Sequence, residues 1–205
     1  RGRPEHTFRE TVADVKAALR FLRKSADTYS IDPERFGAVG RSAGGTLCAF
    51  LALTGDNATF DRNAAHPGIS TTIQAAVCWC GVYDFLSRFS DKEQRKAMGE
   101  EKSQAKKQWN SEWVGEPHAE SSDAWRQASL ARILPDEAPP ILLLHAKDDP
   151  TVPWHQTAIL EKAMKEKGLD VAVRWYETGG HSIVPPDDPG DPPAQTLAFL
   201  QKHLG

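Results

Sequence analysis

The chain has 205 residues, of which 40% are hydrophobic and 26% are charged, and its formal net charge is −3. This length suits a single domain with a buried core, and the mildly acidic balance argues against a nucleic-acid-binding protein. No apolar run approaches the roughly 18 residues that a membrane-spanning helix needs. The sequence begins at Arg1 without a methionine or a signal peptide, which leaves cytoplasmic and secreted locations both open.

The first third of the chain predicts a helix, a strand and a second helix. Apolar residues at helical spacing predict an amphipathic helix over about residues 7–28, at Phe8, Val12, Val15, Leu19 and Leu22. A turn at residues 32–34 leads to a short apolar strand at residues 35–39. Residues 43–53 are small and apolar nearly all round, so we expect a buried helix there.

Further along the chain, strand and helix patterns alternate. Apolar segments predict strands at residues 73–79, 140–146 and 171–177, and helices at residues 155–167 and 194–204. Continuous apolar runs without alternation are typical of a parallel sheet that is covered on both faces. The alternation therefore predicts an α/β doubly wound domain.

Residues 86–130 depart from this rhythm. They are charged, they contain several tryptophans, and they show no strand pattern. We interpret this segment as a helical insertion between the second and third strands. Two readings stay open, a solvated surface excursion and a lid or acyl-pocket wall, since binding residues favour loops on a rigid scaffold.

The segment Gly40–Gly44 reads G-R-S-A-G and fits the G-x-S-x-G nucleophile elbow. In this motif the serine lies on a sharp turn from a strand to a helix, which is the context predicted here. We expect the glycines on either side to remove Cβ atoms that would collide at the turn. Ser42 is then the nucleophile, and the backbone N–H of Ala43 faces a developing oxyanion.

A serine hydroxyl is a poor nucleophile without a base, and the base needs an orienting acid. Asp148 and Asp149 follow the third strand and compete for the role of the acid, whereas His181 follows the fourth strand and is the expected base. Asp84 is a weaker rival for the acid and reads as a cap or turn residue. His145 reads as a structural histidine at the end of a strand.

Other residues near the predicted site are open to two interpretations. Trp79 and Trp154 follow strand ends, so they either stack on a sugar or phenolic acyl group or simply pack the pocket. His155 lies near the acid and is a possible contact. No pair of histidines has metal-ligand spacing, and Cys48, Cys78 and Cys80 read as small buried residues, so we expect no metal.

The order of these motifs resembles the esterase/lipase branch of the α/β-hydrolase superfamily. A "PEH" segment, a helix, an "IDP-R" turn and a "G-x-S-A-G-G" elbow follow one another, and "ASLARILPDEAPPILLLHAKDDPTVPWHQT" continues the match. The chain is similar to bacterial acetyl- and feruloyl-esterase-like carboxylesterases. The resemblance implies a three-layer α/β-hydrolase fold with a mostly parallel sheet, and its D-x-x-V-P stretch implies that Asp149 is the acid and Asp148 a loop-shaping neighbour.

Two departures from the family pattern stand out. Ala146 replaces the glycine of a usual "HG" pair, and the chain starts after the point where the family carries an "HGGG"-like segment that supplies a second oxyanion N–H. We therefore expect residues 1–205 to be the C-terminal portion of one catalytic domain. The missing N-terminal part of the fold is expected from the same longer protein.

The resulting prediction is a serine hydrolase that cleaves carboxylic esters through an acyl-enzyme intermediate, with acyl esters of carbohydrates as one candidate substrate class. It needs no cofactor, and its partner is a small-molecule ester rather than a nucleic acid or a membrane. One alternative is a prolyl-oligopeptidase-like peptidase that shares the triad, although the A-G-G after the serine leans toward esterases. The other is a non-catalytic hydrolase-like binding protein, which the intact Ser, Asp and His positions argue against.

Overall fold

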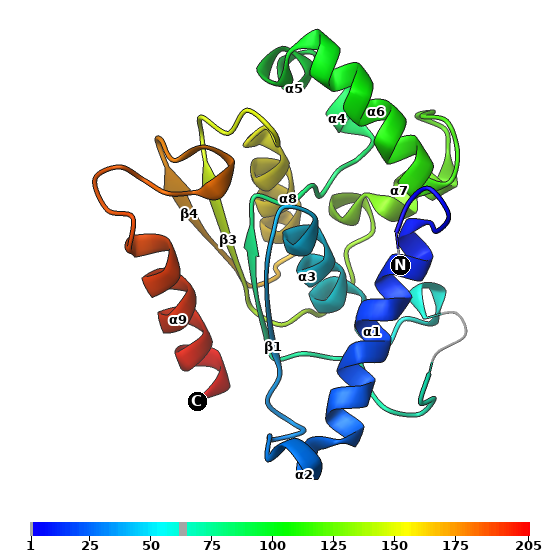
Figure 1. The fold of residues 1–205 in the computed structure, drawn as a ribbon, viewed down its shortest axis with the longest axis vertical. Coiled ribbons are helices and arrows are strands. Elements are labelled where there is room, and N and C mark those ends of the chain that lie inside the picture. Colours follow the sequence, from blue (N-terminus) through cyan, green and yellow to red (C-terminus); the bar gives the residue numbers. More distant parts are fainter. Residues whose placement is uncertain (1, 62–64) are drawn as a thin grey trace.

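The computed structural model describes residues 2–61 and 65–205, and its centre is a parallel four-stranded sheet between helices (Figure 1). The strands are β1 (Gly37–Arg41), β2 (Ala75–Trp79), β3 (Ile141–Ala146) and β4 (Val171–Tyr176). They lie in the order β1-β2-β3-β4, so β1 and β4 are the edges. The predicted parallel sheet is confirmed.

The helices alternate with the strands as predicted. In chain order they are α1 (Phe8–Lys24), α2 (Ala26–Tyr29), α3 (Ala43–Thr54), α4 (Ser87–Ser90), α5 (Lys92–Met98), α6 (Glu100–Val114), α7 (Asp123–Ala128), α8 (His155–Glu166) and α9 (Asp191–Leu204). Within the described residues, none of these helices combines the length and the apolar character that crossing a bilayer requires.

Strand β1 begins two residues later than predicted. The parallel ladder pairs Gly37 with Ala75 and continues to Arg41, which pairs with Trp79. The backbone N–H of Phe36 instead donates to the side-chain oxygen of Gln74 at 2.8 Å. Since a side-chain amide takes the place of a ladder partner there, Phe36 stays outside the strand.

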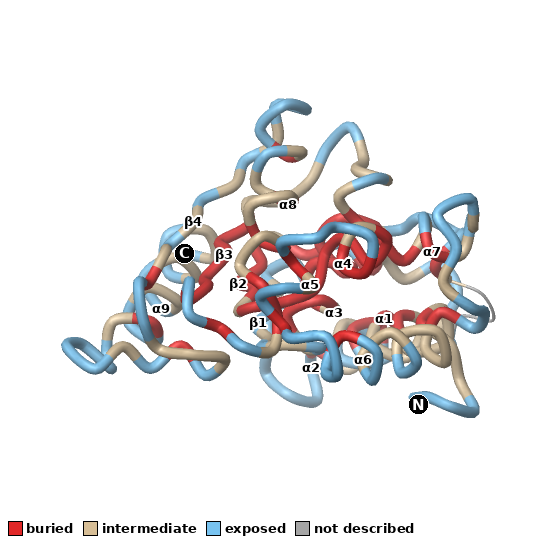
Figure 2. The backbone as a smooth tube through the Cα atoms, turned by 90° about the horizontal axis from the view of Figure 1, so that it is seen from above, coloured by how far each residue is buried: buried red, intermediate tan, exposed pale blue. Residues whose placement is uncertain are grey.

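Side chains of the central strands alternate between two apolar clusters, one on each face of the sheet. Cys78 of β2 belongs to a cluster with Phe50 of α3 and Leu160 of α8, whereas Val77 belongs to a second cluster against which Phe199 of α9 packs. Helices α3 and α8 therefore cover one face and α9 covers the other, which gives the predicted three layers (Figure 1). Figure 2 shows that β2 and β3 are buried along nearly their whole length.

Helix α1 starts at a capping box in which the backbone N–H of Thr7 donates to the Glu10 carboxylate at 2.8 Å. Its apolar face is shorter than predicted, because Leu22 is 39% exposed. The inner face also holds two buried cations. The Lys16 ammonium donates to the Gly55 carbonyl at 2.5 Å, and the Arg20 guanidinium pairs with Asp61. Burial lowers the pKa of Lys16 to about 8.

The segment at residues 86–130 holds α4 to α7, in line with its predicted helical character. Its two ends are fixed to each other and to α8. The side-chain oxygen of Gln156 accepts the backbone N–H groups of Tyr83 and Asp84, both at 2.8 Å. Arg132 donates two hydrogen bonds to the Asp84 carboxylate, at 2.9 and 2.8 Å. Asp84 is thus engaged at the base of the insertion.

Helix α3 approaches β2 closely at Gly45. A Cβ atom built on Gly45 would lie 2.5 Å from the carbonyl oxygen of Trp79, and a backbone atom in a central strand cannot move aside cheaply. A Cβ atom on Gly44, one residue earlier, would meet nothing within 4 Å. The contact between helix and strand therefore depends on Gly45 and leaves Gly44 free to vary.

We expect Gly45→Ala to lower the free energy of unfolding by about 1–3 kcal/mol, because the added methyl group forces α3 away from β2. Gly44→Ala is the matched control and should keep or slightly raise that free energy, since alanine favours a helix. Urea denaturation of both variants measures the difference. Equal stability of the two would contradict the packing account.

Candidate active site

The candidate site lies at the carboxyl edge of the sheet, where three strands end. Ser42 follows the last residue of β1, Asp149 comes three residues after β3, and His181 comes five residues after β4. Because parallel strands end at the same edge, groups far apart in the sequence meet there. Three apolar segments of the sequence thus determine where these three polar side chains lie.

The turn at Ser42 has the backbone conformation of a nucleophile elbow. Its φ of 57° and ψ of −121° lie in a region that costs a non-glycine residue on the order of 1–3 kcal/mol. Two hydrogen bonds hold it, from the Ser42 N–H to the Trp79 carbonyl at 2.9 Å and from the Thr46 N–H to the Ser42 carbonyl at 3.0 Å. The neighbouring strand and the first turn of α3 therefore fix the position of the hydroxyl.

The two glycines of the motif are not equivalent. A Cβ atom on Gly40 would lie 2.3 Å from the carbonyl oxygen of Gly44 and 2.8 Å from the sulfur of Cys48, so the predicted collision is confirmed there. The same prediction is wrong for Gly44, whose Cβ atom would have open space. The constraint acts on Gly40 because the start of α3 folds back over the end of β1.

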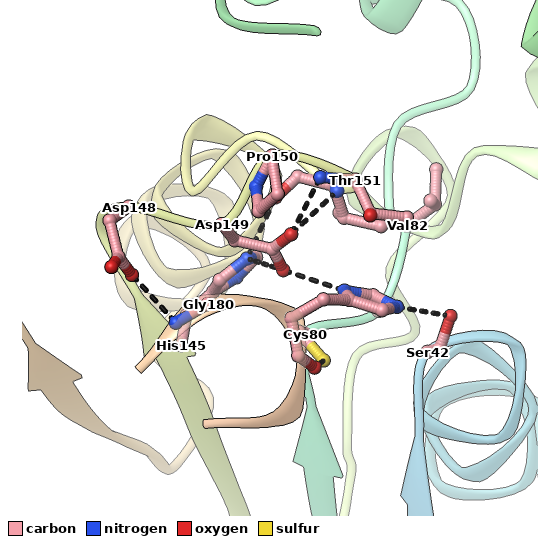
Figure 3. A network of polar contacts seen from close by, with 12 residues as sticks. Ser42, Cys80, Val82, His145, Asp148, Asp149, Pro150, Thr151 and Gly180 are labelled. Carbon is pink, nitrogen blue, oxygen red and sulfur yellow. Dashed lines mark hydrogen bonds and ion pairs between the residues drawn. The ribbon is translucent and has the colours of Figure 1, made fainter. Parts of the chain in front are cut away.

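Hydrogen bonds join the three predicted side chains in one line (Figure 3). The Nδ1 atom of His181 lies 2.7 Å from Oδ2 of Asp149, and its Nε2 atom lies 2.9 Å from Oγ of Ser42. An ionised carboxylate only accepts hydrogen bonds, so Nδ1 carries the proton. The lone pair of Nε2 then faces the serine hydroxyl, which is the arrangement that general-base chemistry needs.

The Asp149 side chain is completely buried. Burial by itself raises the pKa of the Asp149 carboxyl. Hydrogen bonds from His145, His181 and the backbone N–H groups of Thr151 and Val152 outweigh burial and hold this pKa well below its ordinary value. The carboxylate is therefore charged at neutral pH and orients the imidazole of His181.

Asp148 connects the two loops that carry Asp149 and His181. Its carboxylate accepts the backbone N–H of Gly180 at 2.8 Å and that of Gly179 at 3.2 Å. Since His181 is the next residue, Asp148 fixes the turn that presents the imidazole. This is the loop-shaping role that the sequence analysis suggested for Asp148.

His145 lies next to the Asp149 carboxylate. It is fully buried, its Nδ1 atom lies 2.7 Å from the Thr157 hydroxyl, and its Nε2–H donates to the Val152 carbonyl at 3.0 Å. The same Nε2 atom lies 3.3 Å from the Asp149 carboxylate. His145 is thus a satisfied structural histidine, as predicted, that also contacts the acid.

A cavity of about 300 Å³ opens beside Ser42. Ala43, the first residue of α3, lines it, and the first N–H groups of a helix have no acceptor within the helix. Residues of the segment between β2 and β3 form much of the wall, namely Phe85, Arg88, Lys106, Trp109, Asn110 and Trp113. Apart from noting tryptophans and charges in this segment, the sequence analysis singled out none of these residues.

The two tryptophans predicted near the site do not line this cavity. The Trp79 indole N–H donates to the Thr196 hydroxyl of α9 at 3.1 Å, on the other face of the sheet. Trp154 stacks on His155 with ring centroids 4.2 Å apart and meets Trp175 edge-on. Trp79 contributes its backbone carbonyl to the turn at Ser42, where this carbonyl accepts the Ser42 N–H.

The Cys80 thiol also lies next to Asp149 and His181. Its thiol donates to the backbone carbonyl of His181 at 3.3 Å, and burial raises the pKa of the thiol to about 12. Its sulfur and the ligand atoms of Asp149 and His181 lie within 4.8 Å of one another. Because the thiol stays protonated and the other two groups bind each other, this set fits a metal ion poorly.

Two family models match the chain, and named relatives cover most of its length. The BD-FAE family matches residues 1–164, and the Dienelactone hydrolase family matches residues 127–202. The chain is 31% identical over 159 residues to the probable carboxylic ester hydrolase LipM of Mycobacterium tuberculosis, covering 76% of this chain and 34% of LipM. It is 29% identical over 168 residues to the esterase LipQ of the same organism, covering 80% of this chain and 36% of LipQ.

A solved structure shows the same fold. The esterase Est2 of the Planctomycetes species Thermogutta terrifontis, with butyrate bound, is 25% identical with a TM-score of 0.70, covering 96% of this chain and 66% of Est2. The present chain spans about a third of the length of the two mycobacterial relatives. The predicted α/β-hydrolase fold is confirmed, and because the BD-FAE match extends over residues 1–164, the chain belongs to the BD-FAE family.

Proposed function

We propose that the whole protein hydrolyses carboxylic esters, with Ser42 as the nucleophile, His181 as the base and Asp149 as the acid. The observation that carries the proposal is the pair of hydrogen bonds at His181, 2.9 Å to the Ser42 hydroxyl and 2.7 Å to the Asp149 carboxylate. Both distances are within the range for proton transfer between a nucleophile and its base.

Each residue has a definite task in the reaction. Ser42 Oγ attacks the ester carbonyl while His181 Nε2 takes the hydroxyl proton, and the buried Asp149 carboxylate stabilises the imidazolium that forms. The Ala43 N–H at the start of α3 stabilises the negative oxygen. His181 then gives its proton to the leaving alcohol, and a water molecule releases the acyl group by the reverse sequence of proton transfers.

The relatives support ester hydrolysis as the reaction class. LipM and LipQ are named as a probable carboxylic ester hydrolase and an esterase, and Est2 was solved with butyrate. The cavity beside Ser42 is large enough for a short acyl chain, and Ala43 at the start of α3 lines it. That the alcohol part of the ester is a carbohydrate remains a prediction.

The nucleophile is tested by Ser42→Ala. We expect a loss of roughly 10⁴-fold or more in kcat/KM for p-nitrophenyl butyrate, because among residues 2–61 and 65–205 no other hydroxyl is held against His181 Nε2. Ser182→Ala is the control, since it removes a hydroxyl next to the base and should retain activity close to that of the unchanged protein. Near-normal turnover by Ser42→Ala would rule out this nucleophile. Faster cleavage of aminoacyl amides than of esters would favour a peptidase instead.

The acid is tested by comparing its two neighbouring candidates. Asp149→Asn should lower kcat by roughly 10⁴-fold, since the amide no longer stabilises the imidazolium and can force the wrong imidazole tautomer. Asp148→Asn should cost less than about tenfold, because it weakens only hydrogen bonds to backbone N–H groups. Steady-state kinetics with the same ester measure both. A larger loss in Asp148→Asn than in Asp149→Asn would exchange the two roles.

A further inference from the structure

The cavity beside Ser42 has an uneven charge. Three cationic side chains line it, Arg3, Arg88 and Lys106, whereas none of the described residues in its wall is an aspartate or a glutamate. The charge of Arg3 is compensated by an ion pair with Glu112 at 2.6 Å. Neither Arg88 nor Lys106 forms an ion pair with a carboxylate among the described residues. The wall of the cavity thus holds two positive charges that have no ion-pair partner among the described residues.

The Arg88 guanidinium is the more unusual of the two, because the residue is only 3% exposed. Its Nη1 atom donates to the Asn110 side chain at 3.2 Å, its Nη2 atom donates to the Thr151 carbonyl at 3.0 Å, and its Nε atom has no acceptor. Both acceptors are neutral. Burial lowers the pKa of Arg88 to about 10, although the charge of Asp149 raises it, so Arg88 is a cation at neutral pH.

Lys106 of α6 adds a second positive charge to the same cavity. Burial lowers the pKa of Lys106, and the positive charges of Arg88, Lys102 and Arg3 lower it further, against a smaller opposing effect of Asp149. Its ammonium lies 5.3 Å from the centre of the Trp109 ring. Lys106 is half-buried, whereas Arg88 is buried without an ion-pair partner, which is costly, and a bound anion would recover that cost.

The cavity accommodates the acyl part of an ester rather than its alcohol. The leaving oxygen must lie next to His181 Nε2 to receive its proton, and His181 does not line the cavity. The residues that do line it next to the nucleophile are Ala43 and Thr46 of α3. Leu47, Phe85 and Val152 add apolar surface that suits a short methylene chain.

We infer that this cavity binds an acyl chain that ends in a carboxylate, so that the preferred substrates are half-esters of dicarboxylic acids. The inference rests on the proposed function. The Ser42 oxygen forms a bond to the acyl carbon, the bond to the alcohol oxygen breaks, and His181 passes the serine proton to that oxygen. Water then releases a dicarboxylate, whose far carboxylate lies against Arg88 and Lys106.

The test uses the whole protein and compares two esters whose acyl chains have the same number of carbon atoms. They are the 4-methylumbelliferyl half-ester of adipic acid and 4-methylumbelliferyl hexanoate. We expect kcat/KM to be at least about tenfold higher for the half-ester. A tenfold difference is about the smallest effect expected of a hydrogen bond to a charged group. Arg88→Met and Lys106→Met should each reduce this ratio by about tenfold. Lys107→Met is the matched control, because Lys107 is on the same helix but does not line the cavity, and it should leave the ratio unchanged.

The outcomes distinguish a failure of the inference from a failure of the proposed function. Equal or faster hydrolysis of the hexanoate by the unchanged protein would overturn the inference and leave ester hydrolysis intact. Hydrolysis of neither ester would contradict the proposed function and the inference with it. Circular dichroism checks the fold of each variant, and if Arg88→Met does not fold, the ratio measured with Lys106→Met decides. An equal drop in Lys107→Met would assign the preference to general surface charge and overturn the inference.

Discussion

The hydrogen bond between the Ser42 hydroxyl and His181 Nε2 joins groups that are 139 residues apart in the chain. It forms only if β1 and β4 end at the same edge of the sheet and if the loop after each strand has one conformation. The positive φ of Ser42 gives the hydroxyl its direction, and Asp149 gives the imidazole its direction. The remaining parts of the site serve to keep these two directions fixed.

Several contacts do this. The Ser42 N–H is held by the end of β2, the turn before His181 is held by Asp148 after β3, and the Asp149 carboxylate is held by its own loop and by His145. The cost of the strained turn at Ser42 is offset by bonds to β2 and α3, so the fold and the site stabilise each other. A catalytic arrangement on rigid strand ends also needs little reorganisation during the reaction.

The parts of this architecture that are encoded locally could be predicted from sequence. The G-x-S-x-G motif, the apolar strands and the order of Ser42, Asp149 and His181 are short-range patterns, and the structure brings these three residues together. Features decided by contacts across the sheet could not be predicted. The start of β1 depends on a hydrogen bond to the Gln74 side chain. The direction of the Trp79 indole depends on its hydrogen bond to α9, and no pattern in the sequence near Trp79 indicates that contact.

The charged segment at residues 86–130 shows the same limit more strongly. In sequence, Arg88 and Lys106 are two of many cations in a polar segment, and their usual environment is water. Only the packing of α4 and α6 against the loop after β3 buries the first and brings both to the wall of one cavity. Because a buried cation without an ion-pair partner destabilises a fold, the presence of Arg88 in the same cavity as Ser42 is the basis for the proposed carboxylate ligand.

The central claim is that Ser42 is activated by His181, and labelling with a fluorophosphonate tests it most directly. The whole protein is incubated with the reagent, digested, and mapped by mass spectrometry, alongside a His181→Gln variant. The account predicts one label, on the peptide that contains Ser42, with a rate that falls by orders of magnitude in His181→Gln. A label on a different residue, or equal labelling rates in both proteins, would contradict it.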